Sequence, residues 1–176
     1  NPAFWKTPHH LRNLSDKEKI DAAMSRALNF AKNQYNGVVN YMKSIGVNKP
    51  VHIGETGWAT TSSGHYGLNG SRATDEYKQG LYYNQLREWT NTAGISCFYF
   101  EAFDEQWKDV QNPKGSENHF GLINLKGEAK YPLWDLVDKG VFKGFIRNGK
   151  PITKTYKGDK EALMKDVLVP NTEYNR

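Results

Sequence analysis

Acidic residues follow two apolar stretches of this chain, each of which reads as a short buried strand. Glu55 directly follows the first stretch, and Glu101, Asp104 and Glu105 follow the second. The carboxyl ends of neighbouring parallel strands meet at one edge of a sheet, where ligand sites of α/β proteins lie. For any one acid alone, a strand-end cap or an ion pair is the simpler interpretation, because a charge is costly to bury. Several acids at successive strand ends favour a shared cleft.

Carboxylates between aromatic side chains suit carbohydrate chemistry. Trp58 and Trp107 flank these acids in the sequence, and the flat C–H faces of sugar rings pack against such indoles. Glycoside hydrolysis needs one carboxyl that protonates the leaving oxygen and another that attacks the anomeric carbon or activates water. An attacking carboxylate must stay ionised, and the nearby Lys108 could supply the positive charge that keeps its pKa low.

Other chemistries lack support in the sequence. It contains no G-x-x-x-x-G-K-[ST] phosphate loop and no G-x-S-x-G nucleophile motif. His52 and Glu55 are three residues apart on a strand, so they point to opposite faces and do not share a metal. The single cysteine, Cys97, lies in an apolar stretch and is interpreted as a core residue; it excludes an internal disulfide. We therefore expect neither a metal nor a cofactor.

Composition narrows the class of partner. The 176 residues are ordinarily one domain. Aromatic residues make up 13%, more than a core of this size needs, so some should line a surface that binds flat or ring-shaped ligands. The net charge of +5 comes from scattered Lys and Arg residues, which argues against nucleic acid as a partner. No apolar run approaches the roughly 18 residues of a membrane span, so no membrane partner is expected.

The first long periodic segment predicts a helix. Ser15 and Glu18 form a capping-box pattern, and apolar residues recur at helical spacing from Ile20 to Ile45. Gly46 fits a left-handed C-terminal cap. The sequence predicts one helix with a single apolar stripe along its whole length.

The elements that follow alternate between strand and helix. We expect a strand at 51–54, a helix capped by Thr74 that runs through Trp89, a strand at 95–100 and a helix at 132–137. The stretch at 95–100 is almost continuously apolar, which is typical of a parallel strand buried on both faces. Such alternation predicts an α/β protein.

Four segments in this order and spacing resemble the family 17 glycoside hydrolases, the β-1,3-glucanases and their glucanosyltransferase relatives. Gly54-Glu-Thr-Gly-Trp58 is similar to the family's nucleophile motif at the end of the seventh strand of a (β/α)8 barrel. Phe103-Asp-Glu-Gln-Trp-Lys108 resembles the eighth-strand motif of microbial members, and Ser116-Glu-Asn-His-Phe-Gly-Leu122 the segment after it. Asn1-Pro-Ala-Phe-Trp5 is similar to the loop that leaves the sixth strand.

The resemblance implies a role for each matching residue. Glu55 would be the catalytic nucleophile. Residues implied to bind substrate around the cleft, as sugar platforms or accessory charged groups, are Trp5, Trp58, Glu105, Trp107, Lys108 and Glu117. Glu101 has no assigned counterpart, and two interpretations stay open: it joins the cleft, or it caps the strand.

The resemblance also implies that this chain is only part of an active site. The fold expected is α/β, the C-terminal portion of a (β/α)8 TIM barrel with about strands 7–8 and their flanking helices. Residues 1–140 would belong to the barrel and residues 141–176 to a loop-rich C-terminal extension of the same domain. In the family the acid/base glutamate follows an asparagine, and this sequence contains no Asn-Glu dipeptide. The general acid/base is therefore expected outside this chain, on a complementary N-terminal chain or an uncut parent, and a two-stranded remnant should leave open sheet edges and an uncovered apolar side.

The function expected from the sequence is that of a retaining β-1,3-glucanase acting on laminarin-like glucan without a cofactor. A location outside the cytoplasm (secreted, periplasmic or at the cell surface) follows from the resemblance alone. Two alternatives stay open: a non-catalytic glucan-binding segment, and a β-1,3-glucanosyltransferase.

Overall fold

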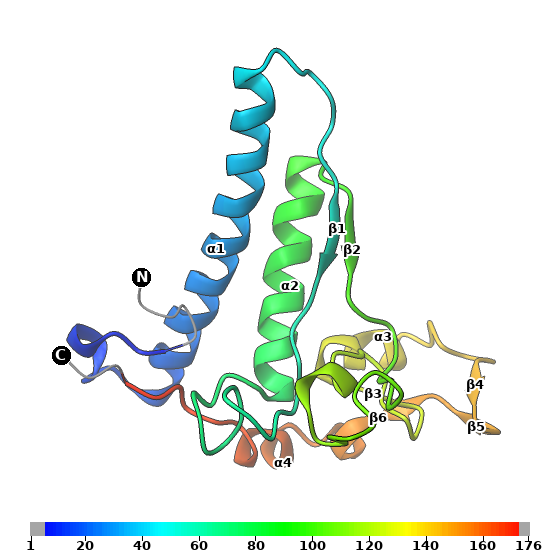
Figure 1. Ribbon diagram of the computed structural model, residues 1–176. Helices are drawn as coiled ribbons and strands as arrows, with labels where there is room; N and C mark the ends of the chain where they lie inside the picture. Colours follow the sequence, from blue (N-terminus) through cyan, green and yellow to red (C-terminus); the bar gives the residue numbers. More distant parts are fainter. Residues whose placement is uncertain (1–5, 173–176) are drawn as a thin grey trace.

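The computed structural model describes residues 6–172 of the chain, which form a mixed α/β structure. Two long helices, α1 (Asp16–Ser44) and α2 (Glu76–Ala93), run side by side, and two short strands, β1 (Ile53–Thr56) and β2 (Cys97–Tyr99), lie along α2 (Figure 1). The loops that follow the strands gather at the lower end of the molecule in Figure 1, together with the small C-terminal elements.

Helix α1 begins as the sequence predicts. The Ser15 hydroxyl accepts from the backbone N–H of Glu18, and the Glu18 carboxylate accepts from the N–H of Ser15 at 2.9 Å, so the capping box is confirmed. The apolar stripe is buried along only part of the helix. Residues of α1 are buried only as far as Ala27, whereas Val38 and Tyr41 are 49% and 65% exposed.

Helix α2 begins one residue later than expected. Its N-cap is Asp75, whose carboxylate accepts from the backbone N–H of Lys78 at 2.8 Å, so the prediction of Thr74 as the cap is wrong. A carboxylate is the stronger cap here because it also carries negative charge at the positive helix end. The helix ends at Gly94 with a φ of 64°, a left-handed C-terminal cap that suits glycine.

Strands β1 and β2 pair in parallel, with Ile53 opposite Cys97 and Thr56 opposite Tyr99 and an irregularity between. The parallel pairing agrees with the predicted α/β alternation. The prediction that the second strand is buried on both faces is wrong, because Phe98 is 67% exposed. Among the described residues this sheet has only two strands, and the face that carries Phe98 is open to solvent.

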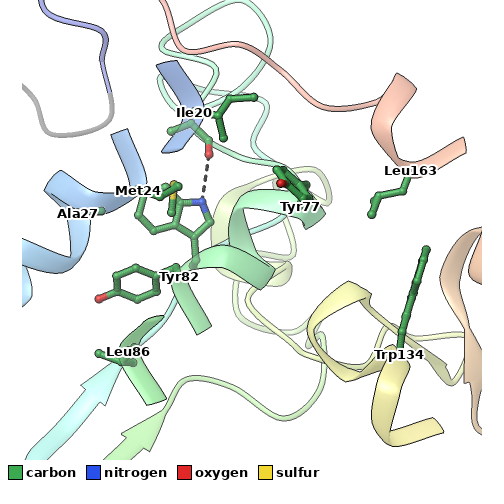
Figure 2. Close-up of a cluster of buried hydrophobic side chains, with 10 residues drawn as sticks. Ile20, Met24, Ala27, Tyr77, Tyr82, Leu86, Trp134 and Leu163 are labelled. Carbon is green, nitrogen blue, oxygen red and sulfur yellow. Dashed lines mark hydrogen bonds between the residues drawn. The ribbon is translucent and has the colours of Figure 1, made fainter. Parts of the chain in front are cut away.

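The main core lies between the two long helices and reaches the C-terminal elements (Figure 2). Ile20 and Met24 of α1 pack with Tyr82 and Leu86 of α2, and Leu163 reaches the same cluster from near the C-terminal end. A second small cluster surrounds Ile123, Ala129 and Leu133. The core therefore joins segments from both ends of the chain around α2.

The segment after residue 120 folds into short elements that pack back on this core. Helix α3 spans Trp134–Asp138 and α4 spans Lys160–Lys165. Short 3-10 helices span His9–Leu11, Ser116–Asn118, Tyr131–Leu133 and Thr155–Gly158. Strand β3 (Glu128–Ala129) pairs in parallel with β6 (Thr153–Lys154), and β4 (Ile146–Arg147) forms a hairpin with β5 (Lys150–Pro151).

The expected helix at 132–137 is present as a 3-10 turn that continues into α3. The segment from residue 141 onward, predicted as a loop-rich extension, contains β4, β5, β6, a 3-10 helix and α4 joined by short turns, and it supplies Leu163, which is 1% exposed in the main core. No helix in residues 6–172 has the length and apolar character that a membrane crossing requires.

Candidate active site

Glu55 lies in β1 with an exposed side chain, one residue from the end of the strand. The next residue, Thr56, is held against helix α2 because its hydroxyl is hydrogen-bonded to the hydroxyl of Tyr82 at 2.8 Å. The backbone N–H of Phe100 donates to the Thr56 carbonyl at 2.8 Å, and a Cβ at Gly57 would overlap the Phe100 carbonyl oxygen. Glycine is therefore required for the turn after Glu55 to lie against the end of β2.

Three charged residues form a cluster where the chain leaves β2. The ammonium of Lys108 lies 2.6 Å from a carboxylate oxygen of Glu101 and 3.1 Å from one of Glu105. Their side chains are only 16%, 12% and 34% exposed respectively, so solvent screens the contacts weakly. One ammonium thus holds two carboxylates in a partly desolvated edge of the site.

Burial raises the pKa of the Glu101 carboxyl, the neighbouring Glu105 raises it further, and Lys108 opposes both effects. For Lys108 the balance is reversed. Burial lowers the pKa of its ammonium, but hydrogen bonds and charge from Glu101 and Glu105 outweigh burial and leave the pKa raised. Lys108 therefore stays charged, while the raised pKa of the Glu101 carboxyl means that it gains a proton more readily than a solvent-exposed glutamate.

Among the ion pairs of residues 6–172, Lys108 contacts Glu101 and Glu105 but not Glu55. The proposed effect of the Lys108 charge on Glu55 stays a prediction, with no direct ion pair behind it. Lys108 is three residues beyond Glu105 and folds back over the Phe100 ring, 3.8 Å from its centre. Glu101, left open by the sequence, lies at the same strand-end edge as Glu55 and joins this cluster rather than acting as a simple cap.

The three tryptophans expected to contact sugar differ in how the structure places them. Trp107 is 70% exposed and presents an open indole beside Lys108. Trp58 is 9% exposed, stacks on Tyr82 at 5.2 Å, and donates from its indole N–H to the Ala73 carbonyl, the dashed line in Figure 2. The prediction that Trp58 is a sugar platform is corrected, because its ring belongs to the core. Trp5 lies outside the described residues.

Glu117 is exposed in the 3-10 helix Ser116–Asn118, on a loop that returns toward Lys108. Asn118, which is fully buried, closes this loop. Its side-chain oxygen accepts from the N–H of Asp109 at 2.9 Å, and its amide donates to the carbonyls of Asp109 and Asn112 at 2.9 and 3.0 Å. Sequence reasoning missed Asn118 as a structural residue, although it lies within the motif that carries the family resemblance.

Two buried polar residues beneath the site were also missed. Gln79 of α2 is completely buried, and its amide donates to the carbonyls of Trp58, Phe120 and Gly121 at 2.9, 3.0 and 3.1 Å. It therefore ties the turn after β1 to the segment after Asn118. The only advance signal is a polar residue on the buried side of a predicted helix.

The second is Lys130, whose ammonium pairs with Asp104 at 2.7 Å. Asp104, one of the acids proposed for the cleft, is 4% exposed, so the structure gives it a buried ion pair in place of an open position. In residues 6–172, no group of three or more His, Cys, Asp or Glu side chains is arranged to hold a metal ion.

The site thus combines an exposed carboxylate at one strand end with ion-paired acids and an open indole at the next. Comparison with known proteins points to one class, glycosidases of β-1,3-glucan. Within that class the chain is similar over its whole length to an endo-laminarinase from Formosa, with a TM-score of 0.94 and 58% sequence identity. It covers 45% of that enzyme.

The curated relatives of this chain are also named as β-1,3-glucan glycosidases. A glucan 1,3-β-glucosidase from Arthroderma benhamiae is 34% identical over 88 residues, which are 46% of this chain and 27% of the relative. A putative glucan endo-1,3-β-glucosidase from Aspergillus niger is 38% identical over 104 residues, 51% of this chain and 15% of the relative. No protein-family model matches the sequence. The chain matches at most about a quarter of the length of these curated relatives, and the resemblance to β-1,3-glucan enzymes of the family 17 type is confirmed.

Proposed function

We propose that this chain supplies the nucleophile half of a retaining glycosidase that acts on laminarin-like β-1,3-glucan. The observation that carries this proposal is the 58% identity and TM-score of 0.94 to an endo-laminarinase across the whole chain. The exposed Glu55 near the end of a parallel strand, beside ion-paired carboxylates, also lies where a glycosidase nucleophile would need to be.

In the proposed reaction, a carboxylate oxygen of Glu55 attacks the anomeric carbon as the glycosidic C–O bond breaks. The leaving oxygen takes a proton from a carboxylic acid outside this chain, so the first step yields a glycosyl-enzyme ester and a free sugar end. Water then attacks the ester with the same outside carboxylate as base, which restores Glu55 and retains the anomeric configuration. In a retaining site the two carboxyl groups lie about 5–5.5 Å apart.

The remaining charged residues act on the substrate rather than on the bond that breaks. Glu105 and Lys108 present a paired anion and cation to sugar hydroxyls, with Glu117 on the adjoining loop. The open indole of Trp107 provides a flat apolar face for a sugar ring. None of these side chains needs a cofactor for that role.

We also propose that the fold is the C-terminal portion of a (β/α)8 barrel, with β1 and β2 as its seventh and eighth strands. Support comes from the parallel pairing of β1 with β2, from the alternation of α1, β1, α2 and β2 along the chain, and from the share of the laminarinase that the chain covers. The exposed apolar side chains on β2 and the second half of α1 would then face the earlier strands, on a complementary N-terminal chain or an uncut parent. A location outside the cytoplasm is proposed on the same likeness.

The test is a laminarin assay of the chain joined to the remainder of the barrel. Glu55→Gln should abolish turnover while laminari-oligosaccharide binding persists, because the amide keeps the shape but cannot attack. Glu88→Gln, an exposed carboxylate on α2, is the matched control and should behave as wild type. An active Glu55→Gln variant would overturn the assignment.

The same assay separates the alternatives. Sugar binding with no turnover by the wild-type protein would favour a non-catalytic glucan-binding segment. Longer products at high oligosaccharide concentration, read by mass spectrometry, would show that a second sugar competes with water for the glycosyl-enzyme and would favour a transferase.

A further inference from the structure

Lys130 is a buried cation whose contacts reach three separate segments around the site. It is 3% exposed, and its ammonium donates to Asp104 at 2.7 Å, to the Thr60 hydroxyl at 2.9 Å and to the His119 carbonyl at 3.3 Å. Thr60 belongs to the segment after β1, Asp104 to the segment after β2, and His119 to the loop that follows. An ammonium has three donors, and here each one holds a different segment.

Each of these segments carries a residue of the proposed site. Thr60 is five residues after Glu55, Asp104 directly precedes Glu105, and His119 is two residues after Glu117. The separations along the chain are short, so a shift at any of the three contacts is passed to the acid beside it.

The three segments that Lys130 contacts also pack closely against one another. The backbone N–H of Thr60 donates to the His119 carbonyl at 3.0 Å, and that of Asp104 donates to the Ile123 carbonyl at 2.9 Å. A Cβ at Gly121 would overlap the backbone of Asp104. Lys130 lies where these contacts converge, so its ammonium fixes the junction as a unit.

Stability alone does not account for this ion pair. Burial lowers the pKa of the Lys130 ammonium, and Asp104 opposes that effect, so the pair offsets a desolvation cost that an apolar pair would not have. In many proteins, apolar side chains of similar volume replace a buried ion pair with equal or greater stability. They cannot, however, hold a hydroxyl, a carboxylate and a carbonyl at fixed directions.

We propose that Lys130 is a positioning residue for the glycosidase reaction. It holds the segment after Glu55 in register with the segments of Glu105 and Glu117, and it acts through those segments without touching substrate. This inference rests on the proposed function, because it assigns a purpose to the register of those three acids.

The test compares ways of losing the pair, in the chain joined to the remainder of the barrel. Lys130→Met leaves the Asp104 carboxylate buried without its cation, so we expect a lower melting temperature and a lower kcat. Adding Asp104→Leu removes that carboxylate and should restore the melting temperature. We expect kcat on laminarin to remain about a hundredfold low in the double variant, with the Kd for laminari-oligosaccharides within about threefold of wild type.

Two further variants complete the design. Lys154→Met removes an ion pair of the same 2.7 Å length, between Lys154 and Asp138, that is open to solvent; it should leave kcat unchanged. Thr60→Val removes the contact with Lys130 and the 3.2 Å hydrogen bond that the Thr60 hydroxyl donates to the His119 carbonyl, both part of the same junction, with almost no change in volume. We expect a several-fold fall in kcat with KM preserved, in a protein that stays folded.

Wild-type kcat in both the double variant and Thr60→Val would overturn the inference and leave Lys130 with a structural role alone. Failure of the proposed function looks different: wild-type protein without laminarin turnover, or with full turnover after Glu55→Gln. Either result removes the reaction and the inference with it.

Discussion

The two ends of the β1–β2 layer are built in opposite ways. At the carboxyl ends of the strands, the lower end in Figure 1, loops, α3 and α4 surround buried polar residues such as Gln79, Asn118 and Lys130. At the opposite end, the second half of α1 leaves Val38 and Tyr41 open to solvent. One end holds its buried polar residues through contacts within residues 6–172, although Oε1 of Gln79 and Oε1 of Glu101 have no hydrogen-bond partner there. The other end leaves apolar surface without cover in that part of the chain.

The difference separates the geometry of the strand-end site, which this chain can hold by itself, from the activity, which requires another part of the barrel. The chain's own contacts hold the segments of Glu55, Glu105 and Glu117 at the strand ends. The apolar end has the character of an interface, because the exposed side chains of Phe30, Val38 and Tyr41 line one open hollow there, and clustered exposed apolar residues ordinarily mark a contact surface. We therefore expect the geometry of the nucleophile side to be intrinsic, and activity to depend on a partner surface.

The largest expected effect distinguishes the two halves of α1. Met24 is 1% exposed in the core, so Met24→Ala should lower the free energy of unfolding by about 2–5 kcal/mol. Val38 is 49% exposed on the same helix, so Val38→Ala should change it by no more than about 0.5 kcal/mol. Urea denaturation of both variants measures the contrast. Equal losses would show that the second half of α1 is buried by a contact absent from this account.

The next largest effect is on association of this chain with the rest of the barrel, with no comparable effect on the stability of the chain itself. Phe98 on β2 is 67% exposed, so Phe98→Lys should leave the free energy of unfolding of the chain itself within about 0.5 kcal/mol of wild type. It should weaken association with the complementary part of the barrel at least tenfold, because a charge would then enter an apolar contact. Asn84→Lys, on an exposed position of α2, serves as the control. Unchanged association would mean that this face of β2 is not the contact surface.

The smallest effect is a pH dependence at the polar end. Burial raises the pKa of the Glu76 carboxyl, while hydrogen bonds from Thr155 and the Tyr131 N–H oppose it. A raised folded-state pKa means that the folded protein binds the proton more tightly, so this group stabilises the fold at low pH. That contribution is lost as pH rises from the ordinary value of 4.5 toward the raised one.

Glu76→Gln keeps an oxygen for both hydrogen bonds but does not titrate. The variant should gain stability relative to wild type as pH rises through this window, in denaturation curves collected from pH 4 to 7. A wild-type protein that gained on the variant over the same range would show that its hydrogen bonds favour the ionised carboxylate more than burial disfavours it.

Local patterns in the sequence predicted the elements well. The capping box of α1 and the glycine at the end of α2 depend on residues close together in the chain, so local end signals predict them. The parallel pairing of β1 with β2 joins distant residues and follows instead from the alternation of strands and helices. Local patterns could not predict that α1 beyond Ala27 and Phe98 on β2 are exposed in this chain. An apolar pattern records the surface a side chain prefers, and says nothing of whether that surface lies in the same chain.

The site was predicted in part for the same reason. The strand-end positions of Glu55 and Glu101 follow from parallel order, but Trp58 and Asp104 turned out to be core residues because of contacts with Ala73 and Lys130, far away in the sequence. Their residue types favour a cleft and a buried contact equally. Only tertiary packing decides between the two.

The most direct test of the account is covalent trapping of Glu55. A fluorinated glucosyl reagent that forms the glycosyl-enzyme quickly and releases it slowly should label the chain, once it is joined to the rest of the barrel, and peptide mapping should place the sugar on Glu55. A label on any other residue, or the same labelling of a Glu55→Gln variant, would contradict the account.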